Sequence, residues 1–324
     1  MFNAITEFLG SIPFFSSLAF GIIAMVIVGS SWCLVGLVMG DAPKRGIEPS
    51  LVQMGGGIFS MTCSLVIMLV TSAYPAVFST TVLLLCLTVF VAGSLNFILL
   101  QLMSKAMQTG PNGVIWSIIQ SALVFPFICG IMFFDVKFTL WRGAGIVFLL
   151  AALVLFAFTK DNSKKAVKSN WKLLAFAAMF LAAIQQNLST LPSYFSETAS
   201  LPSILRSLCG ASGSLCTAII WNVVQMTPER KAQIKQNIRN KTLWKYIAAL
   251  QFFGLIFAYT LTYPGMDVMA RKGFGRMCYP MMVGSCIVSF TLSSVLLLKE
   301  KIRPIQFAAL LVCIGGLVLI CTQA

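Results

Sequence analysis

Side chains that could hold a small polar molecule are concentrated in a few apolar stretches of the sequence. Three consecutive carboxamides, Gln185, Gln186 and Asn187, interrupt one stretch, and Trp116 and Gln120 lie one helical turn apart in another. Successive helical residues point about 100° apart, so the three carboxamides cannot all share one face, and at least one is expected to face protein or a cavity. An indole packs on the apolar face of a ring while an amide orients its hydroxyl groups, a combination suited to a sugar or another polar solute.

Other polar or aromatic side chains inside apolar stretches extend this set. Polar groups within a membrane helix are costly unless partnered, so each is a candidate for solute contact. Each also has a structural alternative: a helix contact for the amides and Trp32, and a place at the membrane interface for Trp116. Tyr279 precedes Pro280, which locally breaks backbone pairing. The candidate substrate-binding residues are Trp32, Asn96, Trp116, Gln120, Gln185, Gln186, Asn187, Gln251, Tyr259 and Tyr279.

Few charged residues are candidates for ion coupling or gating. Asp267 follows Pro264 and Gly265, which weaken a helix and can expose backbone carbonyl groups to a cavity. It is the first candidate for binding a proton, and Glu197 is the second. Both also fit solvated loop ends with an ordinary pKa. Arg206 lies six residues into an apolar stretch, where its side chain either reaches the boundary or contacts a gate or an anion.

Several chemistries are excluded by composition. The chain has no histidine, which removes Ser–His and Cys–His catalysis and leaves proton transfer to carboxylates. Its ten cysteines are scattered through apolar runs without metal-ligand spacing, so we expect no disulfide framework and no metal site. The sequence has no phosphate-binding loop of the ATPase type. We therefore expect neither an enzyme nor a cofactor.

The amount of apolar sequence predicts an integral membrane protein. The 324 residues are 58% hydrophobic and 10% charged, against roughly 45–50% and 25% in soluble domains. The net charge of +14 would suggest nucleic acid in a soluble protein, but here the charges cluster between apolar blocks, so we expect no nucleic-acid partner. A spanning helix needs about 20 apolar residues. Ten such stretches occur, at 14–40, 50–71, 79–106, 113–134, 141–159, 172–194, 200–226, 243–263, 277–298 and 304–322.

Basic residues are divided unevenly between alternate loops. One set of loops holds 17 Lys and Arg and the other holds 5, with Arg206 left inside a predicted helix. Basic loops resist translocation, so the sequence predicts a multi-pass protein of the inner (plasma) membrane with both termini outside the cytoplasm. The two longest polar linkers, 159–172 and 227–242, are then cytoplasmic. We interpret them as solvated topology anchors, with contact to anionic headgroups as the alternative.

A weak internal repeat divides the chain into two halves. The tracts 110–159 and 273–322 both run through a turn, a long helix, an acidic break and a final helix. Ten helices then form five plus five, in residues 1–159 and 160–324. Because five is odd, the second half must be inverted relative to the first, as in secondary transporters.

Short motifs at the ends of each half resemble the drug/metabolite transporter superfamily, of the ten-helix EamA-like type. They are Leu298 to Gln306 followed by Gly315 and Gly316, and Asn96-Phe97 leading to Lys105-Ala106. Leu250 to Phe253 is similar to the L-rhamnose/proton symporter group. One departure is the proline of the fourth helix, which is displaced to Pro126.

The resemblance implies an all-α bundle of two inverted five-helix repeats. Its central cavity would be lined by the first, third, fourth, sixth, eighth and ninth helices, and the last helix of each half would serve as a scaffold or dimer surface, in a monomer or homodimer. The function expected is secondary active transport of a small polar solute, with a sugar-like metabolite favoured, by alternating access and proton-coupled uptake. The alternatives are an exporter of amino acids, other metabolites or drugs and, less favoured, an enzyme acting on membrane lipid.

Overall fold

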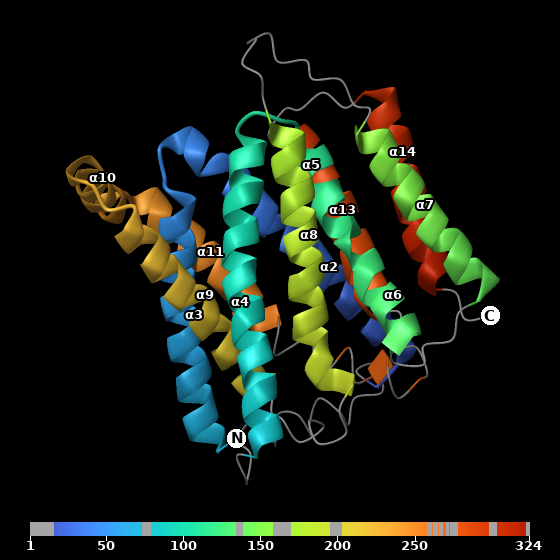
Figure 1. Cartoon of the computed structure of the whole chain (residues 1–324), viewed down its shortest axis with the longest axis horizontal. Coiled ribbons are helices and arrows are strands. Elements are labelled where there is room, and N and C mark those ends of the chain that lie inside the picture. Colours follow the sequence, from blue (N-terminus) through green and yellow to red (C-terminus); the bar gives the residue numbers. More distant parts are fainter. Residues whose placement is uncertain are drawn as a thin grey trace. The chain divides into compact units, whose positions relative to one another are not determined.

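The described part of the chain is helical throughout. The computed structural model describes residues 16–72, 79–133, 139–157, 170–194, 203–257, 278–297 and 303–321, with the single positions 261, 265, 268, 269 and 272 (Figure 1). No strand occurs within these ranges. The α-helices are α2 (Leu18–Asp41), α3 (Pro49–Thr71), α4 (Thr80–Met107), α5 (Asn112–Gln120), α6 (Val124–Phe133), α7 (Leu140–Ala157), α8 (Trp171–Thr190), α9 (Ser203–Val224), α10 (Pro228–Arg239), α11 (Lys241–Phe257), α13 (Cys278–Leu296) and α14 (Pro304–Cys321).

Four of these helices are long and apolar enough to cross a membrane. They are α2, α3, α4 and the part of α9 from Ile204 to Val224. Large apolar side chains stand on their outer surfaces; Val70 of α3, for example, is 80% exposed. A helix bordered by water carries polar residues on its outer face, whereas these faces suit lipid. The expectation of an all-α protein with membrane-length apolar helices is confirmed to this extent.

The polar linker predicted at 227–242 contains a helix, α10, which was not predicted from the sequence. The hydroxyl group of Thr227 accepts a hydrogen bond from the backbone N–H of Arg230 and caps the N-terminus of α10. Pro228 occupies the first turn, where its missing N–H costs nothing. Lys, Arg, Gln, Glu and Ala, which favour helices, fill most of the remaining positions.

The fourth predicted span is divided into two helices. A 3-10 turn, η2 (Ser121–Leu123), separates α5 from α6. Pro126, in the first turn of α6, lacks the N–H that would bond to the carbonyl group of Ala122 in a continuous helix. The displaced proline therefore accounts for the position of the break.

The chain forms two compact units, and each takes helices from both halves of the sequence. Unit 1 comprises Met1–Leu37, Phe138–Thr159 and Phe252–Ala324, and unit 2 comprises Val38–Lys137 and Lys160–Gln251.

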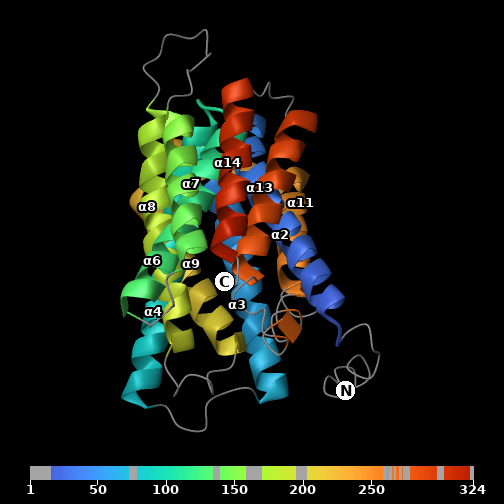
Figure 2. The ribbon, with the colours of Figure 1, turned by 90° about the vertical axis from the view of Figure 1, so that its right-hand side faces the viewer.

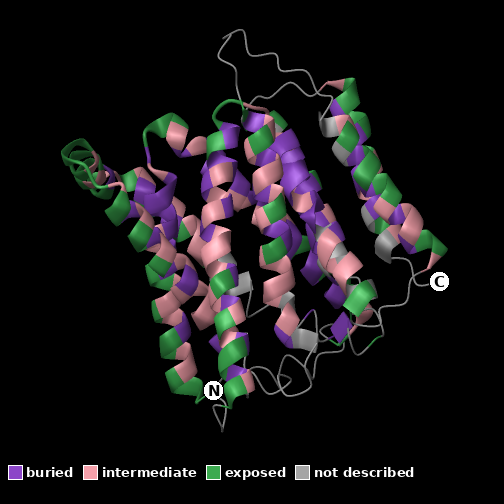
Figure 3. Cartoon of the chain, in the orientation of Figure 1, coloured by how far each residue is buried: buried purple, intermediate pink, exposed green. Residues whose placement is uncertain are grey.

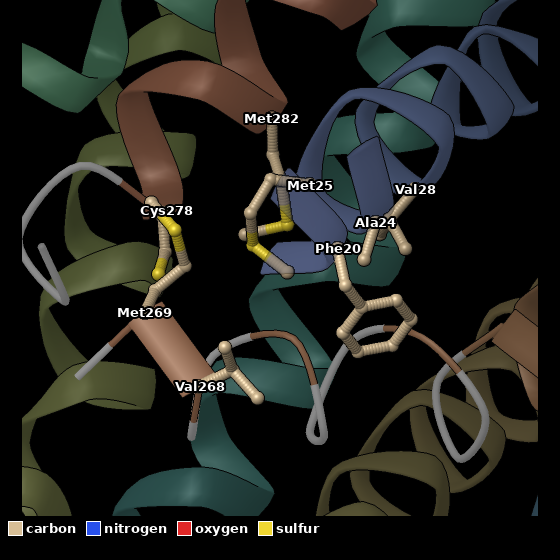
Figure 4. Packing of buried hydrophobic residues seen from close by; sticks show 8 residues of the cluster. All are labelled: Phe20, Ala24, Met25, Val28, Val268, Met269, Cys278 and Met282. Atoms are coloured by element: carbon tan, nitrogen blue, oxygen red, sulfur yellow. The ribbon is translucent and has the colours of Figure 1, made fainter. Parts of the chain in front are cut away.

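In unit 1, α2 packs against α13 and α7 packs against α14. Met25 of α2 and Met282 of α13 belong to one buried cluster with Phe20, Val268, Met269 and Cys278 (Figure 4). Gly29 brings the two backbones together, because a Cβ atom there would lie 2.1 Å from the carbonyl oxygen of Met282. Helices α7 and α14 run side by side (Figure 2), with Gly316 against the backbone of Gly145.

In unit 2, α9 packs against both α3 and α4. A Cβ atom at Gly213 would lie 1.9 Å from the carbonyl oxygen of Phe90, and one at Gly93 would lie 2.0 Å from that of Gly210. On the other side of α9, Gly57 of α3 faces Leu215. Small residues therefore allow α9 to approach its neighbours at backbone distance, as in packed membrane helices. Helices α4, α8 and α5 continue the unit through further contacts.

The close packing of α9 on α4 predicts that alanine is tolerated less well at Gly213 than at Gly315, a glycine of α14. Gly213→Ala places a methyl group against the backbone of Phe90, so we expect a loss of about 1–3 kcal/mol in the free energy of unfolding. A Cβ atom added at Gly315 of α14 would have no described atom within 4 Å. Gly315→Ala should therefore leave stability unchanged or raise it by up to about 1 kcal/mol. Thermal unfolding in detergent measures both, and equal melting temperatures for the two variants would contradict this account of the packing.

Candidate functional site

A polar face runs along α3 inside unit 2. Ser50, Gln53, Ser60 and Ser64, together with Gly57, are spaced by three or four residues and therefore share one side of the helix. We call these five residues the α3 polar face. Two of its hydroxyl groups have partners on neighbouring helices: Ser50 donates to Asn222 Oδ1 of α9 at 3.0 Å, and Ser60 donates to Gln251 Oε1 of α11 at 2.5 Å.

Gln53 differs from its neighbours on this face. It is 8% exposed, and both its amide nitrogen and its amide oxygen are buried without a hydrogen-bond partner among the described residues. Along α3 it lies between Ser50 and Gly57, which both contact α9. Ser60, which contacts α11, follows it by two turns. Leaving a buried polar group unsatisfied costs about 1–3 kcal/mol. A hydrogen bond from this carboxamide to a bound polar molecule would remove that cost.

A second carboxamide of this kind lies on α4. Gln101 is 5% exposed, and its Nε2 is buried without a hydrogen-bond partner in the described part of the chain. Phe97 and Lys105 lie one turn before and one turn after it, and both contact Trp221 of α9. The ring centroids of Phe97 and Trp221 are 6.0 Å apart, and Lys105 Nζ is 5.4 Å from the Trp221 ring. Gln101 therefore shares the side of α4 that faces α9.

A charged cluster closes one end of unit 2. Arg230 of α10 donates to Gln225 Oε1 at 2.8 Å and to Asn222 Oδ1 at 3.2 Å. It also forms an ion pair with Glu48, the residue before α3, at 3.4 Å. The side chain of Arg230 is 16% exposed and that of Glu48 is 24% exposed. Partial burial weakens solvent screening, so this pair holds the segment before α3 to α10 better than a surface pair does.

The side chains of Asn237 and Asp41 also fix the segment between α2 and α3. Asn237 of α10 accepts a hydrogen bond from the backbone N–H of Glu48 at 3.0 Å and donates to the carbonyl oxygen of Gly46 at 3.3 Å. Asp41 accepts from Arg45 at 2.6 Å and from the hydroxyl group of Tyr246 in α11. The bond to Asp41 raises the pKa of the exposed Arg45 guanidinium. This end of unit 2 is therefore tied together by side chains from α2, α10 and α11.

The structure brings one predicted substrate-binding residue to the α3 polar face. Gln251 bonds to Ser60, and its Nε2 lies against Gly56, where a Cβ atom would approach it to 2.6 Å. This is the helix contact that the sequence left open as the alternative. Asn96 on α4 is half-buried and makes no hydrogen bond to a described residue.

The carboxamides of α8 bond mainly within their own helix. Gln185 Nε2 is 3.1 Å from Ser189 Oγ, and Asn187 Nδ2 donates to the carbonyl oxygen of Ala183 at 2.9 Å. Gln186 is half-buried between them. The nearby helix α5, which contacts α8, carries Trp116 and the half-buried Gln120. Trp116 is only 4% exposed, so it is enclosed by protein and does not stand at an exposed membrane interface.

The remaining predicted residues lie away from the α3 polar face or outside the described residues. Trp32 belongs to unit 1 and packs against the cluster around Met25. Arg206 is half-buried in α9. Tyr259, Asp267 and Glu197 lie outside the described residues, and Tyr279 lies in α13 with a side chain outside them.

The sequence analysis missed Gln53, Gln101 and Asn222. Each is an amide inside an apolar helix, and the recurrence of polar residues at 50, 53, 60 and 64 was the available signal. A short run of amides such as 185–187 is more conspicuous in the sequence. A polar face on one side of a helix instead requires polar residues spaced by three or four positions.

Comparisons with known proteins identify a fold and no family. No protein-family model matches the chain, and no curated protein matches it. Sixteen solved chains match in structure. One of them is a crystal structure whose description names no function; it has a TM-score of 0.56 and 14% identity, over 91% of this chain and 95% of the other. A likeness at this identity shows a shared fold alone.

Gln53 and Gln251 of unit 2 should respond in opposite directions to the same substitution. Gln251→Met removes the hydrogen bond to Ser60, so the free energy of unfolding should fall by about 1 kcal/mol. Gln53→Met replaces an unsatisfied amide with an apolar group of similar size, which should leave stability unchanged or raise it. Chemical denaturation of the purified protein compares them. A larger loss for Gln53→Met than for Gln251→Met would show that Gln53 is bonded in the folded protein.

Proposed function

We propose that this chain is a secondary transporter of the drug/metabolite type, which moves a small, uncharged polar solute across the plasma membrane by alternating access. The observation that carries the proposal is a pair of buried carboxamides, Gln53 and Gln101, in helices long enough to cross a membrane. The amide nitrogens of both have no hydrogen-bond partner among the described residues. A polar group in such a helix is costly and typically marks a solute or ion path. A carboxamide both donates and accepts hydrogen bonds, as hydroxyl-rich solutes require.

The pairing of helices in unit 2 supports two related halves. In the predicted order of spans, α3 and α9 are the second helices of their halves, and α4 and α11 are the third. The second helix of each half contacts the third helix of the other: α9 meets α4 through Gly210 and Gly213, and α3 meets α11 through Gly55 and Gly56. The two glycine clusters thus play the same part in both pairs.

Further pairs follow the same exchange. The first helix of each half meets the fourth helix of the other, as α2 with α13 in unit 1 and α8 with α5 in unit 2. Equivalent helices also pair with each other, as α7 with α14. This exchange is what a duplicated five-helix unit produces, and an odd number of spans requires its second copy to be inverted.

The gathering of basic segments supports the proposed orientation. The segment between α2 and α3 is bonded to α10, and Ser104 near the end of α4 donates to the carbonyl oxygen of Met39 at 2.7 Å. Lys44, Lys105 and Lys231, which belong to the basic-rich set of loops, therefore lie at one end of unit 2. We assign this end to the cytoplasm, because basic loops resist translocation.

The solute class follows from the polar groups available. Among the described residues the only carboxylates are Asp41, Glu48 and Glu229, and all three lie at the basic end of unit 2. The buried polar groups of α3 and α4 are amides and hydroxyls, which favour an uncharged, sugar-like metabolite over an organic cation. Asp267 remains the proposed proton-binding group for coupled uptake.

Ligand-dependent stability tests the solute site. A ligand that binds the folded protein stabilises it by about 2.7 kcal/mol at a hundred times its Kd. We therefore expect a thermal-shift screen of sugars, nucleosides, amino acids and vitamins to identify a stabilising sugar-like compound. Gln53→Met and Gln101→Met should weaken its binding about tenfold, the loss expected when one hydrogen bond of about 1.4 kcal/mol is removed.

The matched control is Gln225→Met at the charged end, away from the polar face. It should reduce stability through loss of the Arg230 contact while leaving ligand affinity unchanged. Undiminished affinity in both Gln53→Met and Gln101→Met would remove these residues from the site. Radiolabelled flux into and out of proteoliposomes then separates uptake from the alternative, export of amino acids or other metabolites. Chemical conversion of the compound without transport would indicate an enzyme, such as one that modifies lipid.

A further inference from the structure

Polar contacts to neighbouring segments hold one side of helix α10 in place. Arg230 and Asn237 lie on that side and bond to the segment between α2 and α3 and to the end of α9. Asn237 is 4% exposed. At the N-terminus of α10, the backbone N–H of Glu229 and the hydroxyl group of Thr227 lower the pKa of the exposed Glu229 carboxyl group. The helix is therefore a fixed element and not a solvated tether.

A neighbouring face of α10 is basic and exposed. Lys231, Lys235 and Ile238 follow one another at intervals of four and three residues, so they share a face. All three are exposed, and Figure 3 shows most of the helix in the colour for exposed residues. Glu229 lies on another side of the helix, so no carboxylate of α10 neutralises this face.

An aromatic side chain borders the basic face. The indole N–H of Trp244 donates to the carbonyl oxygen of Ile238 at 2.8 Å, which fixes the ring beside that residue. Trp244 is 54% exposed and Ile238 is 47% exposed. Lysines next to an exposed indole and an exposed aliphatic side chain are typical of a helix lying at the membrane interface, where the ammonium groups meet phosphates and the apolar groups enter the boundary.

Helix α10 begins directly beyond a helix that is apolar enough to cross a membrane. Helix α9, which is apolar enough to cross a membrane, ends at Val224, four residues before Pro228. Val223 and Val224 are 62% and 77% exposed. The apolar outer surface of α9 thus extends to its last turn, and the basic face of α10 starts directly beyond it.

We infer that the face formed by Lys231, Lys235, Ile238 and Trp244 is a binding site for anionic phospholipid headgroups on the cytoplasmic leaflet. Cationic side chains near such a surface each contribute about fivefold in affinity. The clustered lysines, with no carboxylate of α10 on their face, complement the negative charge of the headgroups. The position of α10 directly after a helix that could cross a membrane places this face near the membrane surface. The inference rests on the proposed membrane insertion but not on solute transport, so the two proposals can fail separately.

Native mass spectrometry of the detergent-purified full chain tests this site. We expect dioleoyl phosphatidylglycerol to bind more tightly than dioleoyl phosphatidylcholine. The double variant Lys231→Gln/Lys235→Gln should lose about 30-fold in affinity for phosphatidylglycerol, with unchanged affinity for phosphatidylcholine. The control Lys272→Gln removes an exposed charge from unit 1 and should change neither affinity.

Three outcomes would overturn the inference. Equal binding of the two lipids by the unaltered protein would show no preference for anionic headgroups, and undiminished phosphatidylglycerol binding by the double variant would place the site elsewhere. Displacement of phosphatidylglycerol by millimolar inorganic phosphate would identify a site for free anions instead. A second variant, Trp244→Leu, should weaken binding of phosphatidylglycerol while keeping all the lysines, which distinguishes an interfacial site from a general attraction of charges.

Discussion

A carboxamide buried in an apolar helix requires a hydrogen-bonding partner, and this requirement connects the fold to the proposed function. In water Gln53 and Gln101 would be fully solvated, but within unit 2 they are more than nine-tenths buried and their amide nitrogens lack a partner among the described residues. The cost, about 1–3 kcal/mol for each group, is a substantial fraction of the stability of a folded domain. In the function we propose, a polar solute that reaches these amides offsets that cost when it binds, so molecules rich in hydroxyl or amide groups would be preferred.

Glycine contacts around α9 determine where the polar faces lie. Gly93, Gly210 and Gly213 bring α4 to backbone distance from α9, and Gly57 does the same for α3. Larger residues at these positions would separate the helices and remove the close packing beside the α3 polar face and Gln101. At the basic end, Arg230 and Asn237 hold α10 against the segment before α3. The same polar anchoring leaves the lysine face of α10 free to contact lipid headgroups.

Much of the helical organisation could be predicted from the sequence, because runs of about 20 apolar residues have few other solutions. Helix α10 was missed because polar composition suggested a linker, although Thr227, Pro228 and the helix-favouring residues that follow form an N-terminal signal. The candidate site was predicted less well. Adjacent amides such as Gln185 drew attention, yet Gln185 and Asn187 bond within α8, while Gln53 is recognised only when its neighbours on α3 and α9 are known. Sequence spacing defines a face but not the partner that the face meets.

The most direct test of the proposed solute site is a density map of the protein in lipid nanodiscs with the stabilising compound bound. Our account predicts density for that compound within about 3 Å of Gln53 Nε2 or Oε1, the distance of a hydrogen bond, with its hydroxyl groups directed at the amide. An amide at position 53 packed against aliphatic side chains, with the compound bound elsewhere, would contradict the account.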